Sequence, residues 1–231
     1  MRLCKFVLAL AVVALLSAPA LAQRQRGGGG GRGTSLDGLA ENKSVQEELK
    51  VDEDQAKKVK DAVAKVKEDL KDEYTKIGRQ STASDDEKAA ARKKTSEAQA
   101  KALKDVLKTD QMKRLQQIHR QQEGLRVFQD EEVQTALKLS DDQKSKLKEI
   151  GEALQKERGE LFPRGQKPSA DALTKYQGLQ KDAMSNAQKT LTDNQKKTYK
   201  DLTGEPFEVK FDRQGGRQGG KPGGGKPRSD F

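Results

Sequence analysis

Glutamine recurs four times in this chain at the end of one short pattern. The pattern is an aliphatic residue, a helix-capping or polar residue, two further polar residues and then glutamine. Two copies are strict and two are looser. A glutamine amide has two N–H donors and an oxygen with two lone pairs, so these side chains could bind backbone groups or a polar ligand. The residues that define the four copies are Val51, Asp52 and Gln55; Leu107 and Gln111; Leu139, Ser140 and Gln143; Leu191, Thr192 and Gln195.

The residue types fit a helix-capping box. Ser140 and Thr192 can accept a hydrogen bond from the backbone N–H three residues later, and the glutamine at that position can accept from the N–H of the cap. Asp52 can act as a cap in the same way. Lys108 cannot accept, so we expect the cap to shift to Thr109. Ligand binding by the glutamines remains the alternative.

No set of residues in the sequence indicates a reaction. There is one histidine, His119, and one cysteine, Cys4, and no glycine-rich phosphate loop or nucleophile elbow occurs. We expect His119 to be exposed on a helix, and acidic pairs such as Asp85 and Asp86 to interact with a helix dipole. We therefore predict a protein that is not an enzyme, with no catalytic, cofactor-binding or metal site.

The first 22 residues have the pattern of an export signal. Arg2 and Lys5 precede an apolar run of residues 6–16, which is too short to span a bilayer as a helix. Ala20 and Ala22 fit the small residues of a cleavage site. We predict that residues 1–22 are removed and that the protein contacts the membrane only transiently, through this segment, so that the mature protein is periplasmic or extracellular and has no cysteine.

Glycine-rich segments lie at both ends of the predicted mature chain. Residues 23–34 and 208–231 contain most of its excess positive charge, whereas the middle has 35 basic and 33 acidic residues. We predict that both tails are disordered. Contact with an anionic polymer is possible for such tails, but the few aromatic residues and the export signal argue against nucleic acid.

The middle of the chain has the composition and periodicity of amphipathic helices, with coiled-coil-like seams. Asp52 is predicted to start one helix that ends at Gly78, and Ser84 to start the next. Ser140 and Ser169 are predicted to start a second pair, with a break at residues 162–168. The apolar stripe of the first helix consists of Val59, Val63, Val66, Leu70, Tyr74 and Ile77.

The two halves of the middle segment resemble each other. Residues 133–139 match residues 45–51 at an offset of 88, and Gln195 and Leu202 match Gln111 and Ile118 at an offset of 84. We predict an all-α fold of two tandem antiparallel helical hairpins, a first repeat at residues 35–128 and a second at residues 129–207.

The strict copies of the pattern resemble the Leu-Thr-x-x-Gln motif of the Spy/CpxP family of bacterial periplasmic proteins. The resemblance rests on Leu139, Ser140 and Gln143 and on the copy that ends at Gln195, and it covers roughly residues 44–204. Family members usually carry two such motifs, whereas this chain carries four. The resemblance implies an envelope-stress role, such as chaperoning unfolded proteins without ATP, inhibiting a sensor kinase or metal-linked sensing.

Two functions agree with the sequence. The first is a chaperone-like protein that binds unfolded clients or a partner protein through shallow apolar seams within a mixed-charge surface. The alternative is a structural or adaptor protein of the cell envelope, whose basic tails contact anionic polymers.

Overall fold

The computed structural model describes residues 34–78, 80–163 and 165–211, and this part of the chain is all-helical. The predicted export signal, most of the N-terminal tail and residues 212–231 lie outside the described residues. The elements are α1 (Leu36–Ala40), α2 (Lys43–Glu48), α3 (Glu53–Asp69), α4 (Lys71–Lys76), α5 (Asp85–Lys104), α6 (Thr109–Glu123), the 3-10 helix η1 (Gly124–Gln129), α7 (Glu131–Leu137), α8 (Asp141–Leu161), α9 (Ala170–Lys189) and α10 (Asp193–Thr203).

The first predicted helix is divided into α3 and α4. The backbone of Leu70 leaves the helical region, with φ −115° and ψ 28°. No glycine or proline marks this position in the sequence, so the break was not predicted. It lets α4 pack on α5, where Glu73 Oε1 lies 2.8 Å from Lys94 Nζ and the Tyr74 hydroxyl accepts a hydrogen bond from Gln99.

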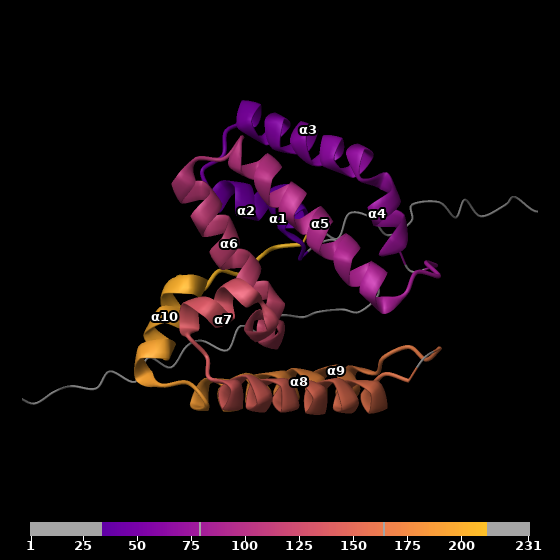
Figure 1. Cartoon of the computed structure of the whole chain (residues 1–231), viewed down its shortest axis with the longest axis vertical. Coiled ribbons are helices and arrows are strands. Elements are labelled where there is room, and N and C mark those ends of the chain that lie inside the picture. The colour runs from indigo at the N-terminus through magenta and orange to yellow at the C-terminus, as the bar shows by residue number, and fades with distance from the viewer. Residues whose placement is uncertain (1–33, 79, 164, 212–231) are drawn as a thin grey trace, which may run out of the picture.

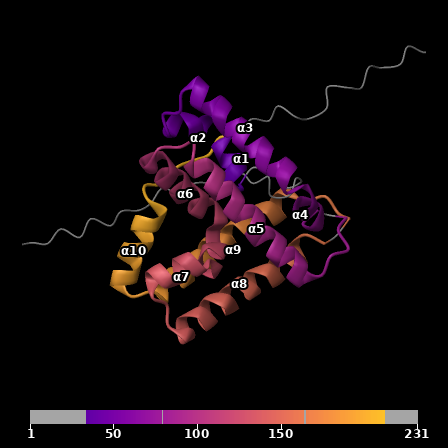
Figure 2. The ribbon, with the colours of Figure 1, turned by 45° about the horizontal axis from the view of Figure 1, so that its top comes forward.

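The second pair of long helices follows its predicted capping residues. Ser140 caps α8 and Ser169 caps α9, each through a hydrogen bond to the backbone three residues later. The two helices pack along each other. Figure 1 shows α8 and α9 along one side of the molecule and α3 to α5 along the opposite side, with α6, α7 and α10 between them. In Figure 2, α3 again lies at the top and α8 at the bottom.

Two separate apolar clusters form the core. The first is built by α1, α2, α3, α5 and α6, and its fully buried side chains include Leu39, Leu103 and Leu115. The second is built by η1, α7, α8, α9 and α10, with Val127 and Val133 fully buried. Each cluster therefore combines short helices with one pair of long helices.

The first cluster also contains Val209, which follows α10 in the chain and is 4% exposed. The predicted C-terminal tail begins at Glu208. The first residues of this segment are held in place, since the Lys210 backbone is hydrogen-bonded to the side chains of Asn42 and Ser44 near the start of the described chain.

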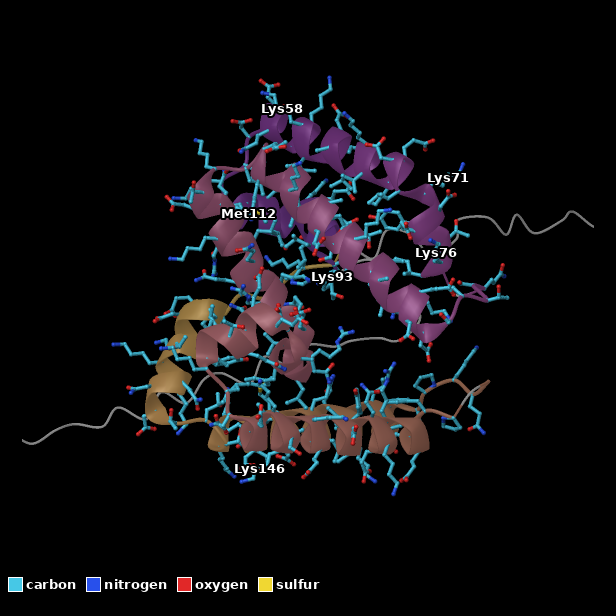
Figure 3. The ribbon with its side chains drawn as sticks, viewed as in Figure 1. Lys58, Lys71, Lys76, Lys93, Met112 and Lys146 are labelled. Atoms are coloured by element: carbon cyan, nitrogen blue, oxygen red, sulfur yellow. The ribbon has the colours of Figure 1, made fainter. Side chains whose placement is uncertain are left out.

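Charged side chains cover the outer faces of the helices. Lys58 on α3 and Lys146 on α8 project outward on opposite sides of the molecule (Figure 3). Within the described ranges, no helix combines the length and the apolar character needed to cross a membrane.

Candidate functional site

The four glutamines of the recurring pattern lie in the first turns of α3, α6, α8 and α10. Ser140 and Gln143 form the predicted capping box, as do Thr192 and Gln195. Asp52 accepts a hydrogen bond from the Gln55 backbone N–H at 2.7 Å. The sequence pattern therefore specifies where these helices start.

The glutamines also form pairs, which the sequence did not reveal. Gln143 Nε2 donates to Gln195 Oε1 at 2.7 Å, and Gln195 Nε2 donates back to Gln143 Oε1 at 2.9 Å. Gln143 donates further to the Thr190 carbonyl at 2.8 Å, and Gln195 donates to the Leu137 carbonyl at 3.1 Å. The pair thus joins the starts of α8 and α10 to the ends of α7 and α9.

Gln55 and Gln111 form an equivalent pair. Gln55 Nε2 donates to Gln111 Oε1 at 2.7 Å, and Gln111 Nε2 donates back at 3.1 Å. The second donors bind the Val106 and Leu49 carbonyls, both at 3.0 Å. Gln111 is 9% exposed, so this pair is more deeply buried than its counterpart.

Lys108 is the exception within the pattern. We expected the cap to shift to Thr109, but Lys108 keeps the N-cap position and Thr109 is the first residue of α6. The lysine side chain cannot accept a hydrogen bond, so only the reciprocal half of the box forms, in which the Lys108 N–H donates to Gln111 Oε1 at 2.9 Å.

The aliphatic residues of the pattern anchor it in the two apolar clusters. Leu107 is buried in the first cluster, where Val51 is half-buried, and Leu139 and Leu191 are buried in the second. Each copy of the pattern therefore couples an apolar contact to a helix start.

The hydrogen bonds leave these amides little capacity for a ligand. Gln111, Gln143 and Gln195 each use both donors, and each oxygen accepts from a backbone N–H and from the partner amide. Satisfied amides of this kind fix the relative position of chain segments. The geometry favours the capping interpretation over ligand binding by the glutamines.

Other local contacts recur at the same offset of 88 residues. Gln46 Nε2 donates to the Ala40 carbonyl at 2.9 Å, and Gln134 Nε2 donates to the Phe128 carbonyl at 2.8 Å. Lys50 and Lys138 both adopt a left-handed backbone conformation, with φ of 53° and 50°. The resemblance between the halves thus extends from residue types to backbone conformation.

Half-buried apolar side chains form a seam between α8 and α9. We define the α8–α9 seam as six half-buried side chains beyond the second cluster. They are Leu154, Leu161, Phe162, Leu173, Tyr176 and Leu179. The Phe162 and Tyr176 rings meet edge to face at 5.4 Å between centroids. On α8 only Leu147 is buried, and on α9 only Ala187.

Helices α3 and α5 bury more side chains than α8 and α9 do. Val59, Val63 and Val66 are buried on α3, and Ala91 and Leu103 on α5. Helix α1 and helix α4 pack on α5, whereas the main contact of α8 and α9 with the rest of the described chain is η1, whose Gln129 side chain lies near Gly151 in the middle of α8. Apolar surface is therefore distributed unequally between two otherwise similar pairs of helices.

His119 is half-buried, not exposed as the sequence suggested. It faces a shallow hollow together with Glu123, Arg126 and the start of α1. Burial, reinforced by Arg120, lowers the pKa of His119, and burial, reinforced by Asp130, raises the pKa of Glu123. In the described part of the chain, no group of three or more His, Cys, Asp or Glu residues could hold a metal ion.

Tyr199 packs inside the second cluster. Its ring stacks on Phe128 with 5.2 Å between centroids, and burial raises the pKa of its hydroxyl to about 12. The contact links α10 to η1 and is structural, since the hydroxyl meets only the sulfur of Met184, at 4.0 Å.

Comparison of the chain with models of known protein families, with curated proteins and with solved structures found no match.

Proposed function

We propose that the protein is an exported, non-enzymatic helical protein that holds unfolded polypeptides without ATP. The observation that carries this proposal is the α8–α9 seam. Its apolar side chains are half-buried, and they lie along a helical pair whose main contact with the rest of the described chain is η1. A shallow apolar surface of this kind favours weak binding of apolar segments over tight binding of one folded partner.

The charges around the seam support binding of diverse chains. Residues 141–189 carry basic and acidic side chains in similar numbers, and most are exposed. Such a surface neither repels nor strongly selects a client by net charge. Weak, reversible contact requires no energy source for release.

We further propose that the fold consists of two tandem helical-hairpin units, as a duplicated member of the Spy/CpxP-like proteins would have. The equivalent glutamine pairs, the equivalent left-handed lysines and the Gln46 and Gln134 contacts support this. By these features, α2 in the first unit corresponds to α7 in the second, and α6 corresponds to α10. At the start of each unit, α1 corresponds to η1. The difference between the units then lies in how much of each long pair is covered.

The direct test is suppression of aggregation. The mature chain, residues 23–231, is added at a roughly equimolar ratio to an unrelated protein diluted from urea, and light scattering is followed without ATP. We expect delayed and reduced scattering. The seam variant Leu154→Ser with Leu173→Ser should need about fivefold more protein for the same effect, since the loss of two half-buried leucines costs about 1 kcal/mol.

The matched control changes exposed positions on the same two helices, Gln155→Ser with Thr174→Ser. It should act like the unaltered chain. Absence of suppression by the unaltered chain, or equal activity of the seam variant, would refute the proposal. Salt-sensitive binding to cell-envelope fractions that depends only on the tails would support the adaptor function instead.

A further inference from the structure

Residues 204–211 cross the surface of the first apolar cluster without forming a helix or a strand. Gly204 ends α10 with φ 63°, and the Gln117 side chain occupies the place where a Cβ atom would lie. Pro206 restricts the preceding residue to an extended conformation. The chain therefore leaves α10 and runs back over α6 toward α2 as an extended segment.

Alternate side chains of this segment face the protein. Val209 is 4% exposed within the first cluster, and Phe207 is half-buried beneath the Arg114 guanidinium, whose Cζ lies 5.9 Å from the ring centroid. Glu208 and Lys210 are exposed. The surface between α2 and α6 thus accepts two apolar side chains that are separated by one residue.

Side chains of α6 hold the backbone at the start of the segment. Gln121 Nε2 donates to the Thr203 and Glu205 carbonyls at 2.6 and 2.8 Å, and Gln121 Oε1 accepts from the Phe207 N–H at 2.9 Å. Arg114 donates to the same Glu205 carbonyl at 2.9 Å. Gln121 bonds only to N–H and carbonyl groups of the main chain. These hydrogen bonds therefore do not depend on which side chains the bound segment carries.

Residues at the start of α2 hold the other end. Asn42 Nδ2 donates to the Lys210 carbonyl at 2.9 Å, and the Lys210 N–H donates to Ser44 Oγ at 3.0 Å. The segment is therefore bound as an extended peptide is bound in a groove, through its main chain and two alternate apolar side chains.

We propose that this groove, formed by α2 and α6, is a second docking site for unfolded clients, and that residues 205–210 occupy it in cis between clients. This inference rests on the proposed function. The client segment it fits is extended and carries two apolar residues separated by one. A displaced Val209 uncovers apolar surface of the first cluster, which the incoming segment covers again.

The tethered segment sets the strength of competition. A segment joined by a short linker has an effective concentration on the order of 1 mM. If it binds in trans with a Kd of about 100 µM, it weakens a competing peptide about tenfold. The groove is therefore selective for clients that bind at least as well as the chain's own segment.

The experiment uses a fluorescent peptide with the sequence of residues 204–211 and the full mature chain. Binding is measured by fluorescence anisotropy. The variant Phe207→Ser with Val209→Ser weakens the internal segment, and we expect it to bind the peptide about tenfold more tightly than the unaltered chain does. The control variant Glu208→Ser with Lys210→Ser alters the exposed side chains and should resemble the unaltered chain. A peptide with serine in place of both apolar residues should bind neither the unaltered chain nor the Phe207→Ser, Val209→Ser variant.

Equal peptide affinity for the variant and the unaltered chain would overturn the proposal, as would binding of the serine peptide. A dimer in sedimentation whose dissociation parallels peptide binding would also overturn it, because the occupant would then be the segment of a second copy. Peptide binding without suppression of aggregation would leave the groove in place and refute the proposed function.

If the apolar-to-serine variant loses its helical circular dichroism, hydrogen exchange on the unaltered chain decides the question. We expect the N–H groups of Phe207 and Lys210 to exchange through local opening, much faster than that of Leu115 in α6. Equal protection of all three would show that the segment leaves only on global unfolding, and would overturn the proposal.

Discussion

Replacing Gln143 by leucine tests whether the paired glutamines hold the helices together. The substitution removes four hydrogen bonds, two with Gln195, one to the Thr190 carbonyl and one from the Ser140 N–H. Leucine and glutamine have similar helix propensities, so the intrinsic preference for α8 is unchanged. The expected effect is therefore the loss of these bonds, including those that the side chain makes to the Thr190 carbonyl and the Ser140 N–H.

The expected cost follows from these four bonds. A net contribution of about 0.5 to 1 kcal/mol each, at the lower end of the usual range because Gln143 is partly exposed, gives a loss of about 2 to 4 kcal/mol in the free energy of unfolding. With a urea dependence of about 2 kcal/mol per molar, the unfolding midpoint should fall by about 1 to 2 M. Unfolding of residues 23–231 in urea, followed by circular dichroism, gives this value directly.

A matched control lies on the same helix. Gln155 is exposed on α8 and makes no hydrogen bond of this kind, so Gln155→Leu should change the midpoint little. A double-mutant cycle with Gln195→Leu should show a coupling of about 1 to 2 kcal/mol from the two shared bonds. If Gln143→Leu is no more harmful than Gln155→Leu, or if the cycle shows no coupling, the paired amides do not hold the hairpin base.

Three further predictions concern backbone conformation and pH. Lys138→Gly should stabilise the protein by about 0.5 to 1 kcal/mol, because φ of 50° strains a residue that has a side chain. The control Lys144→Gly, inside α8, should destabilise the protein by about 1 kcal/mol. Thermal unfolding of the two variants measures both effects. Burial lowers the pKa of folded His119, so stability should decline as the pH falls through about 6.5, and His119→Asn should reduce this decline in urea titrations between about pH 7.5 and 5.5. The raised pKa of Glu123 acts in the opposite direction, since it favours the folded state at acidic pH, and Glu123→Gln should therefore make the decline steeper.

The sequence predicted the helices whose signals are local. Ser84, Ser140, Ser169 and Thr192 cap helices at the predicted positions, because a cap requires only residues three apart on one chain. The similarity of residues 45–51 and 133–139 likewise predicted matching starts for α3 and α8. The same logic failed at Leu70, where tertiary packing of α4 on α5 interrupts a continuous apolar stripe.

Only the tertiary structure decided which distant groups meet. Gln55 and Gln111 lie 56 residues apart, and their amides pair because the hairpin returns α6 to the start of α3. Val209 is likewise buried in a cluster with residues of α1 and α2, at the opposite end of the described chain. Composition cannot show contacts between such distant segments, and for this reason it assigned residues 208–231 to a disordered tail.

The sequence by itself determined an all-helical chain with repeated, capped helix starts, since capping and amphipathic periodicity act within a few residues. The tertiary structure decided that the long helices α3 and α5 bury more side chains than α8 and α9 do. Periodicity gives the apolar face of a helix, but which neighbours cover that face depends on packing between segments far apart in sequence.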